Sequence, residues 1–285
     1  MIKFGPSGAD IGFYETGSSA TIEIPGYLKS LGLECFEYSF GRGVRMGSET
    51  ALSIGEAFRA SEIELSVHAP YYINFANPES DKIDLVYNYV LSSLKALNNL
   101  GGTRCVFHPG SPLKQTRAEA VRIMLSNIDA LIPIIYENGF ENMLLCAETM
   151  GKINQLGSLQ EIIEICNLDK LIIPCVDFGH INARGMGVLK QKEDYKRVLD
   201  ALFDGIEEWK VKNMHIHFSK IEYGNSGEIR HLTFEDEKFG PRFEPLAELL
   251  SEYKMTPYVI CESAGTQGRD AAEMKKIYSS FANAI

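Results

Sequence analysis

Residues 171 to 180 read LIIPCVDFGH, a run of apolar residues that ends in an aspartate and a histidine. A short apolar run bounded by a turn is typical of a strand buried on both faces of a parallel sheet. Asp177 and His180 follow where such a strand would end. The stretch therefore predicts a buried strand that carries side chains of metal-binding type at its carboxyl end.

The same pattern, a short apolar run that ends in a turn residue, occurs eight times along the chain. The predicted strands are residues 2 to 7, 33 to 39, 63 to 69, 103 to 109, 142 to 149, 171 to 178, 213 to 219 and 257 to 264. Between them, segments such as 83 to 100 and 119 to 136 place apolar residues at helical spacing. Eight alternating strand and helix units predict parallel strands closed into an α/β fold, the (β/α)8 TIM barrel.

Length and composition favour one domain. The chain has 285 residues, 45% of them hydrophobic, and no linker or low-complexity stretch interrupts the pattern. We expect residues 1–285 to form a single TIM-barrel domain with its functional site at the carboxyl ends of the strands. No apolar stretch approaches the roughly 20 residues that span a bilayer, and the start lacks a signal-peptide core. We therefore expect a cytoplasmic protein with no membrane partner and no obligatory protein partner.

The cysteines predict a reduced core. The six lie at positions 35, 105, 146, 166, 175 and 261, without a close Cys-x-x-Cys pair, and five fall within predicted strands. Cys146 and Cys175 each stand two residues before a candidate ligand and could point into the barrel below it. Packing is the expected role of both.

The net charge bears on the class of substrate. With 28 basic and 38 acidic residues the chain carries −10, which argues against a polyanion such as nucleic acid. Four or more acids at a metal site, with up to three divalent ions returning +6, would nevertheless make the site itself positive. The total charge weakens a nucleic-acid substrate without excluding it.

Side chains of metal-binding type stand at the ends of six consecutive predicted strands. They are His68, His108, Glu148, Asp177, His180, His215 and Glu262. A single buried histidine is more often a core residue, but core residues have no reason to favour the same end of every strand. Mixed imidazole and carboxylate ligands favour Zn²⁺, with Mn²⁺ or Fe²⁺ as alternatives, over Ca²⁺ or Mg²⁺.

The number of candidates predicts more than one ion, since a single catalytic zinc uses three protein ligands. The long connection from 224 to 240 (GNSGEIRHLTFEDEKFG) adds Glu228 and His231. Long connections in compact domains are often functional. We expect two or three ions held by this set.

Six motifs, in order, make the chain resemble the endonuclease IV family over nearly its full length. They are HAPYYIN (68 to 74), FHPGS (107 to 111), ETMG (148 to 151), VDFGH (176 to 180), MHIHFSK (214 to 220) and ES (262 to 263). The resemblance implies a TIM barrel with a trinuclear zinc site. It also implies base excision repair, in which the enzyme cuts the phosphodiester 5′ to an abasic site in double-stranded DNA.

Carried over by position, the resemblance implies three zinc sites. His68 and His108 would bind one ion, and Glu148 would bridge it to a second, held also by Asp177, His215 and Glu262. The third ion would be bound by His180 and His231. In the implied hydrolysis, Glu148 or Glu262 is the catalytic residue that orients the attacking water.

Several residues are candidate substrate contacts. Tyr71 stands where the family has a tyrosine that reaches into the DNA, and Arg42 lies near the family's arginine-bearing loop. Other basic residues near the motifs could hold phosphates or be ordinary solvated side chains: Lys114, Lys152, Lys220 and Arg230.

The sequence departs from the family at three places. Ile229 stands where the family has an aspartate two residues before His231, so Glu228 is the expected replacement. The family's HLNDAK is HIHFSK here, and alternation puts His217 on the same face as His215, as a supporting group or an extra ligand. The loop SFGRGVRMG (39 to 47) lacks the family's Asn, Arg and Trp pattern.

Two other functions fit parts of the pattern. A xylose isomerase-like sugar isomerase or epimerase would use the same barrel, with Glu148 and Glu262 as an acid–base pair and one metal polarising the sugar oxygens. The net charge, the altered loop and Ile229 favour this alternative. A non-catalytic metal-binding or nucleic-acid-binding barrel is the third possibility, but nearly all candidate ligands are present.

Overall fold

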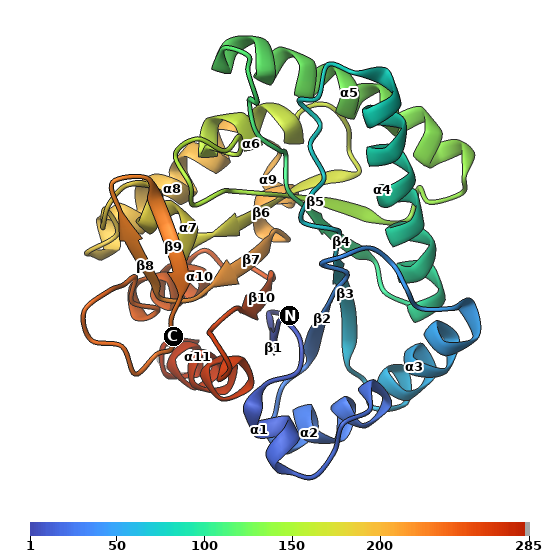
Figure 1. Ribbon diagram of the computed structural model, residues 1–285. Helices are drawn as coiled ribbons and strands as arrows, with labels where there is room; N and C mark the ends of the chain where they lie inside the picture. The colour runs from blue at the N-terminus through green and yellow to red at the C-terminus, as the bar shows by residue number, and fades with distance from the viewer. Residues whose placement is uncertain (283–285) are drawn as a thin grey trace.

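Eight parallel strands form one sheet in the computed structural model, which describes residues 1–282. The strands are β1 (Lys3–Pro6), β2 (Cys35–Ser39), β3 (Glu64–His68), β4 (Arg104–Phe107), β5 (Leu144–Glu148), β6 (Ile172–Asp177), β7 (His215–Phe218) and β10 (Tyr258–Cys261). Their order is β1-β10-β7-β6-β5-β4-β3-β2, so β1 and β2 are the two edges. All eight predicted strands and the TIM barrel are confirmed (Figure 1).

The two edges approach each other and nearly close the barrel. Glu34 N donates to Phe4 O at 3.0 Å, Gly8 N donates to Glu37 O at 2.9 Å, and Ser7 forms a parallel bridge with Glu37. Gly5 allows this approach, because a Cβ atom there would lie 1.7 Å from the Cys35 carbonyl oxygen. A larger residue at position 5 would therefore push β1 away from β2.

Helices surround the barrel (Figure 1). They are α1 (Ile11–Glu15), α2 (Ile24–Ser30), α3 (Ser48–Ala60), α4 (Ser80–Leu100), α5 (Arg117–Glu137), α6 (Leu159–Cys166), α7 (Phe178–Arg184), α8 (Lys192–Gly205), α9 (Glu208–Lys212), α10 (Glu244–Glu252) and α11 (Gln267–Ala282), with a 3-10 turn at Thr21–Glu23. Capping boxes begin α5 at Thr116 and α6 at Ser158. The predicted helical segments 83 to 100 and 119 to 136 lie within α4 and α5.

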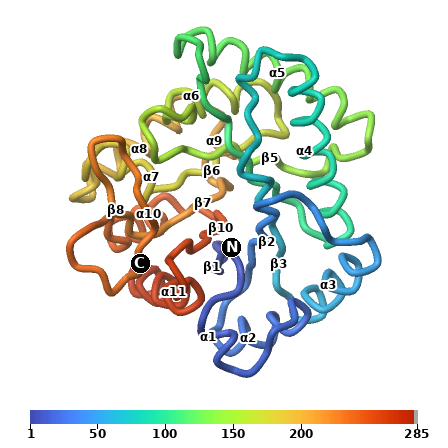
Figure 2. The backbone as a smooth tube through the Cα atoms, viewed as in Figure 1, coloured from blue at the N-terminus to red at the C-terminus, as the bar shows by residue number. Residues whose placement is uncertain are grey.

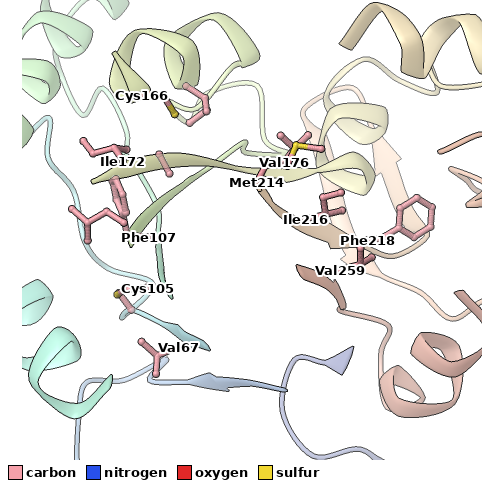
Figure 3. Packing of buried hydrophobic residues seen from close by; sticks show 14 of the residues in the cluster. Val67, Cys105, Phe107, Cys166, Ile172, Val176, Met214, Ile216, Phe218 and Val259 are labelled. Carbon is pink, nitrogen blue, oxygen red and sulfur yellow. The ribbon is translucent and has the colours of Figure 1, made fainter. Parts of the chain in front are cut away.

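The main core lies between the strands and the helices (Figure 3). Outward-facing strand residues such as Val67, Phe107, Ile172 and Ile216 are buried there. The inward-facing residues fill the barrel below the site, among them Val106, Cys146, Ile173 and Cys175. All six cysteines are free and buried, as predicted.

The connection from 224 to 240 is only partly a loop. Its first half belongs to an antiparallel hairpin formed by β8 (Ile221–Gly224) and β9 (Gly227–His231). This hairpin lies outside the barrel beside α7 (Figure 2). The hairpin is bound to the β5–α6 loop, since Glu228 N donates to Gly151 O and Ile153 N donates to Ser226 O, each at 3.1 Å. These backbone bonds hold Glu228 and His231 against the carboxyl ends of the barrel strands.

Among residues 1–282, no helix has the length and apolar character that crossing a membrane requires.

Candidate metal centre

The first group of candidate ligands comes from the ends of three adjacent strands. His68 Nε2 lies 3.1 Å and His108 Nε2 lies 3.0 Å from the same oxygen, Glu148 Oε2. One ligand atom from each of these residues lies within 4.8 Å of the others. The carboxylate of Glu148, which is 1% exposed, therefore faces two imidazoles at once. The structure brings together the three residues that the sequence assigned to the first ion.

The second group contains Glu148 again, with Asp177, His217 and Glu262. His217 Nδ1 lies 3.1 Å from Glu148 Oε1 and 3.5 Å from Glu262 Oε2. The resemblance to the endonuclease IV family implies that His215 belongs to this group. His215 is instead one layer deeper in the barrel, with Nε2 3.0 Å from Glu37 Oε2.

The register of the strands explains this correction. Both histidines of β7 point into the barrel, because side chains two residues apart share a face. His217 pairs with Asp177 of β6, whereas His215 pairs with Cys175. Alternation alone gives the face and not the depth, so the sequence could not choose between the two histidines.

The third group consists of His180, Glu228 and His231. His180 Nε2 lies 3.4 Å from Glu228 Oε2, and His231 Nε2 lies 3.9 Å from Glu228 Oε1. Ile229 is 57% exposed and points away from the group. The expected replacement of the family's aspartate by Glu228 therefore agrees with the geometry. Gly151 leaves the necessary room, because a Cβ there would lie 2.7 Å from Glu228 Cβ.

Glu37 of β2 is a buried carboxylate that sequence reasoning missed. It is 0% exposed and lies 3.0 Å from His215 Nε2 and 3.1 Å from His217 Nε2, measured to its nearer oxygen in each case. The sequence did indicate this residue, because Glu37 is a charged residue within the strand CFEYS. Side chains alternate between the two faces of a strand, and this alternation puts Glu37 on the inward face. His215 and His217 also form a group with Cys175.

Charge–charge interactions shift the pKa values of the buried groups in opposite directions. Burial opposes ionisation of Glu148, but His217 and His108 hold its pKa well below the usual range. Burial also disfavours the charged form of His180, yet Asp177 and Glu148 raise its pKa to about 10. Burial, reinforced by Glu262 and Glu148, raises the pKa of Asp177. Without another cation, the acids of the centre depend on protonated histidines.

The residues fit divalent metal ions, as their hydrogen bonds show. His68 Nδ1 donates to Ala69 O at 2.7 Å and His180 Nδ1 donates to Thr149 O at 2.9 Å. Each Nε2 then faces a carboxylate oxygen, which is an acceptor only, so a cation or a proton must lie between them. Asp177 Oδ2 is also buried without a hydrogen-bond partner among residues 1–282. Imidazole and carboxylate donors in this arrangement suit Zn²⁺, Mn²⁺ or Fe²⁺.

A cleft of about 480 Å³ opens onto these groups. Glu262 lines it, as do residues of the first and third groups. Tyr71 lies at its edge, 55% exposed, with its ring 5.8 Å from that of His108 and its hydroxyl 2.8 Å from Ser39 Oγ. Lys152 also lines the cleft and is exposed.

The other predicted contacts lie apart from the cleft lining. Lys220 Nζ donates to the backbone oxygens of Phe234 and Asp236, so it ties down the loop after the hairpin. Arg230 pairs with Glu222 at 2.7 Å on the exposed face of the hairpin. Arg42 and Lys114 are exposed and are not among the residues that line the cleft.

Comparison with known proteins places the chain in a family. Residues 26–279 match the family described as xylose isomerase-like TIM barrel, and the chain belongs to this enzymatic family. It is 32% identical over 279 residues to the uncharacterised protein MJ0133 of Methanocaldococcus jannaschii, covering 98% of this chain and 97% of that one. It is 28% identical over 193 residues to a probable endonuclease 4 of Methanosphaera stadtmanae, covering 66% of each chain.

Solved structures share the fold at low identity. A D-tagatose 3-epimerase-like protein aligns with a TM-score of 0.73 and 19% identity, over 99% of both chains. Endonuclease IV from Thermus thermophilus aligns with a TM-score of 0.68 and 18% identity, over 99% of this chain and 100% of that one. These likenesses establish the barrel, and the barrel alone does not distinguish the two chemistries.

Proposed function

We propose that this protein is a metal-dependent endonuclease that hydrolyses the phosphodiester 5′ to abasic sites in double-stranded DNA. The observation that carries the proposal is the presence of three adjacent ligand groups, two of which share Glu148. A cluster of this size suits phosphodiester hydrolysis, in which the attacking and the leaving oxygens both need stabilisation. Similarity to a probable endonuclease 4 supports endonuclease activity.

The side chains divide into distinct roles. When bound, Zn²⁺ or a similar ion would polarise the phosphate oxygens and lower the pKa of water. Glu148 is buried, with His68 and His108 facing one of its oxygens and His217 the other, so it serves as a shared ligand. The side chain of Glu262 is 17% exposed to the cleft and can accept a hydrogen bond from the attacking water and orient it.

Substrate contacts are proposed for two residues at the cleft. Tyr71 presents an exposed aromatic ring on which a base or the abasic sugar can pack. Lys152 is exposed at the same cleft and can pair with a phosphate next to the cut. Because Lys220 and Arg230 already bind groups of the protein, Lys152 is the better candidate for a phosphate contact.

The test is cleavage of a labelled duplex that contains one abasic-site analogue. Metal-loaded protein should cut this duplex and leave a 3′-hydroxyl, and should leave an undamaged duplex intact. EDTA-treated protein should not cut, and added Zn²⁺ should restore cutting. Protein with full metal content that leaves the damaged duplex intact would contradict the proposal.

Sugar isomerisation or epimerisation is the second candidate. A cleft of about 480 Å³ is within the usual range for small-molecule sites, and two of the five predicted basic contacts bind protein groups instead of facing it. Glu148 and Glu262 would then exchange a proton with the carbon next to the sugar carbonyl. Incubation of the metal-loaded protein with a ketohexose, followed by chromatography of the products, tests this reaction directly.

A further inference from the structure

The histidines of the metal centre differ in which ring nitrogen they present. His68 and His180 each donate an Nδ1–H to a backbone carbonyl, so Nε2 is the atom free to bind an ion. His217 is reversed. Its Nε2 lies 3.1 Å from Glu37 Oε1, whereas its Nδ1 faces Glu148 and Glu262.

The hydrogen-bonding capacity of the Glu37 carboxylate determines which ring nitrogens of His215 and His217 carry a proton. An ionised carboxylate accepts hydrogen bonds and donates none, so both imidazoles that contact it must present an N–H. His215 therefore carries its proton on Nε2, and its buried Nδ1 has no hydrogen-bond partner among residues 1–282. His217 likewise carries a proton on Nε2, and its Nδ1 faces two other carboxylates, so a metal ion or a second proton must lie between them.

We propose that Glu37 is a positioning residue that makes His217 bind its metal ion through Nδ1, an inference that rests on the metal centre proposed above. Glu37 is the carboxylate of a carboxylate–histidine–metal arrangement, in which the partner of one ring nitrogen fixes the tautomer and the orientation of the other. His215 occupies a second side of the same carboxylate. With Ser66 Oγ 3.4 Å away, Glu37 is held in place from β3 and β7.

The test uses protein labelled with ¹⁵N in its histidines and loaded with ¹¹³Cd²⁺. Long-range ¹H–¹⁵N spectra identify the two nitrogens of each ring, and coupling to cadmium shows which one binds. We expect cadmium coupling at Nδ1 of His217 and at Nε2 of His68 and His180. His217→Asn assigns the signals of His217.

Variants separate positioning from folding. Glu37→Gln keeps an acceptor oxygen but not the charge, so we expect Nδ1 binding with metal affinity lowered roughly 10-fold to 100-fold, the usual effect of losing such a partner. Glu37→Ala should abolish the coupling at His217 or move it to Nε2. Glu64→Gln is the matched control. Glu64 is a carboxylate at the start of β3, at the opposite end of that strand from His68, and it pairs with Lys3. That control should match the unmodified protein.

Several outcomes would overturn the assignment. Coupling at Nε2 of His217 in the unmodified protein, or no coupling there while His68 and His180 bind cadmium, would refute it and leave the metal centre standing. Cadmium bound to a thiolate that disappears in Cys175→Ser would place the ion instead in the deeper group with His215. Absence of coupling at every histidine would refute the metal centre itself and this inference with it. None of these results depends on whether DNA is cut.

Discussion

At the scale of single residues, Glu148 connects the parts of the centre. Its Oε2 faces His68 and His108, and its Oε1 faces His180 and His217, all at 3.0 to 3.3 Å. A carboxylate with four imidazole neighbours can bridge two ions, whereas a neutral amide has only one acceptor oxygen. The neighbouring histidines also hold its pKa low, so it is ionised and ready to bind at neutral pH.

Glu148→Gln should therefore remove at least one metal ion per chain. If the proposed function is correct, cleavage should fall on the order of 100-fold or more, the scale of losing one preorganised electrostatic group. Metal content after dialysis, measured by mass spectrometry, is the direct readout. Glu222→Gln is a suitable control, since Glu222 is on the outer face of the hairpin and pairs with Arg230. Unchanged metal content in Glu148→Gln would remove Glu148 from the set of ligands.

At the scale of elements, the β8–β9 hairpin and the β5–α6 loop form one wall of the cleft. Arg184 donates to the backbone oxygens of Met150, Lys152, Ile153 and Gln155. Backbone hydrogen bonds then connect this loop to the hairpin that carries Glu228 and His231. The third ligand group thus depends on two segments outside the barrel strands.

Glu228→Ala should lower the metal content by one ion, because His180 and His231 alone leave that ion with two ligands. The first two groups do not include Glu228 and should keep their ions. Titration with Zn²⁺ after chelation measures the stoichiometry, with Glu222→Ala on the same hairpin as the control. Full stoichiometry with unchanged affinity in Glu228→Ala would mean that another residue replaces the family's aspartate.

A second prediction concerns Glu161, which holds the start of α6 and the end of the β5–α6 loop. Its carboxylate accepts from the N–H groups of Gly157 and Ser158 and from Arg117, at 2.7 to 2.8 Å. Burial alone would raise the pKa of Glu161, but Arg117 and the two N–H groups lower it. Glu161→Gln should therefore reduce the free energy of unfolding at pH 7 by about 1.5 to 3 kcal/mol.

The sign of the shift gives a pH dependence. A carboxyl whose pKa is lower in the folded state stabilises the protein above its unfolded pKa, and this contribution is lost as the pH falls through the folded value. The difference between the original protein and Glu161→Gln should shrink below about pH 4.3. Denaturant unfolding at several pH values measures it, with Glu164→Gln on the same helix as the control. A difference that is constant with pH would show that ionisation of Glu161 is not involved.

At the scale of the whole molecule, the sequence predicted the barrel because each strand and helix carries its own local pattern. The run from Ile172 to Asp177 shows this, since an apolar strand is followed at once by the polar residues of the site. The same logic placed candidate ligands at the ends of β3, β4, β5 and β6 and after β10, but at β7 it chose His215, the first residue of that strand. The sequence could not indicate how deep a side chain lies within the barrel, or which side chains contact each other across it.

Three residues show those limits. His215 and His217 have the same periodicity, and only the register of β7 with β6 determines which of them lies beside Asp177. Glu37 reaches the two histidines from across the barrel, 178 and 180 residues away in sequence. Such contacts depend on how eight strands close, which no local pattern specifies.

Metal removal should lower the stability of the whole barrel. The centre gathers Glu148 and Asp177 from the ends of two strands and Glu262 from the residue after a third, and without ions the buried acids must be neutralised by protons on histidine. An ion that binds only the folded state stabilises it by RT ln(1 + [M]/Kd), about 2.7 kcal/mol at 100 times Kd.

Denaturant unfolding at increasing free Zn²⁺ should therefore show a midpoint that rises with the logarithm of metal concentration. The slope should fall in Glu148→Gln, because that variant holds fewer ions, and should be retained in Glu222→Gln. A midpoint independent of free Zn²⁺ would mean that metal binding is not coupled to folding, and that hydrogen bonds among the histidines and acids suffice to hold the strand ends together.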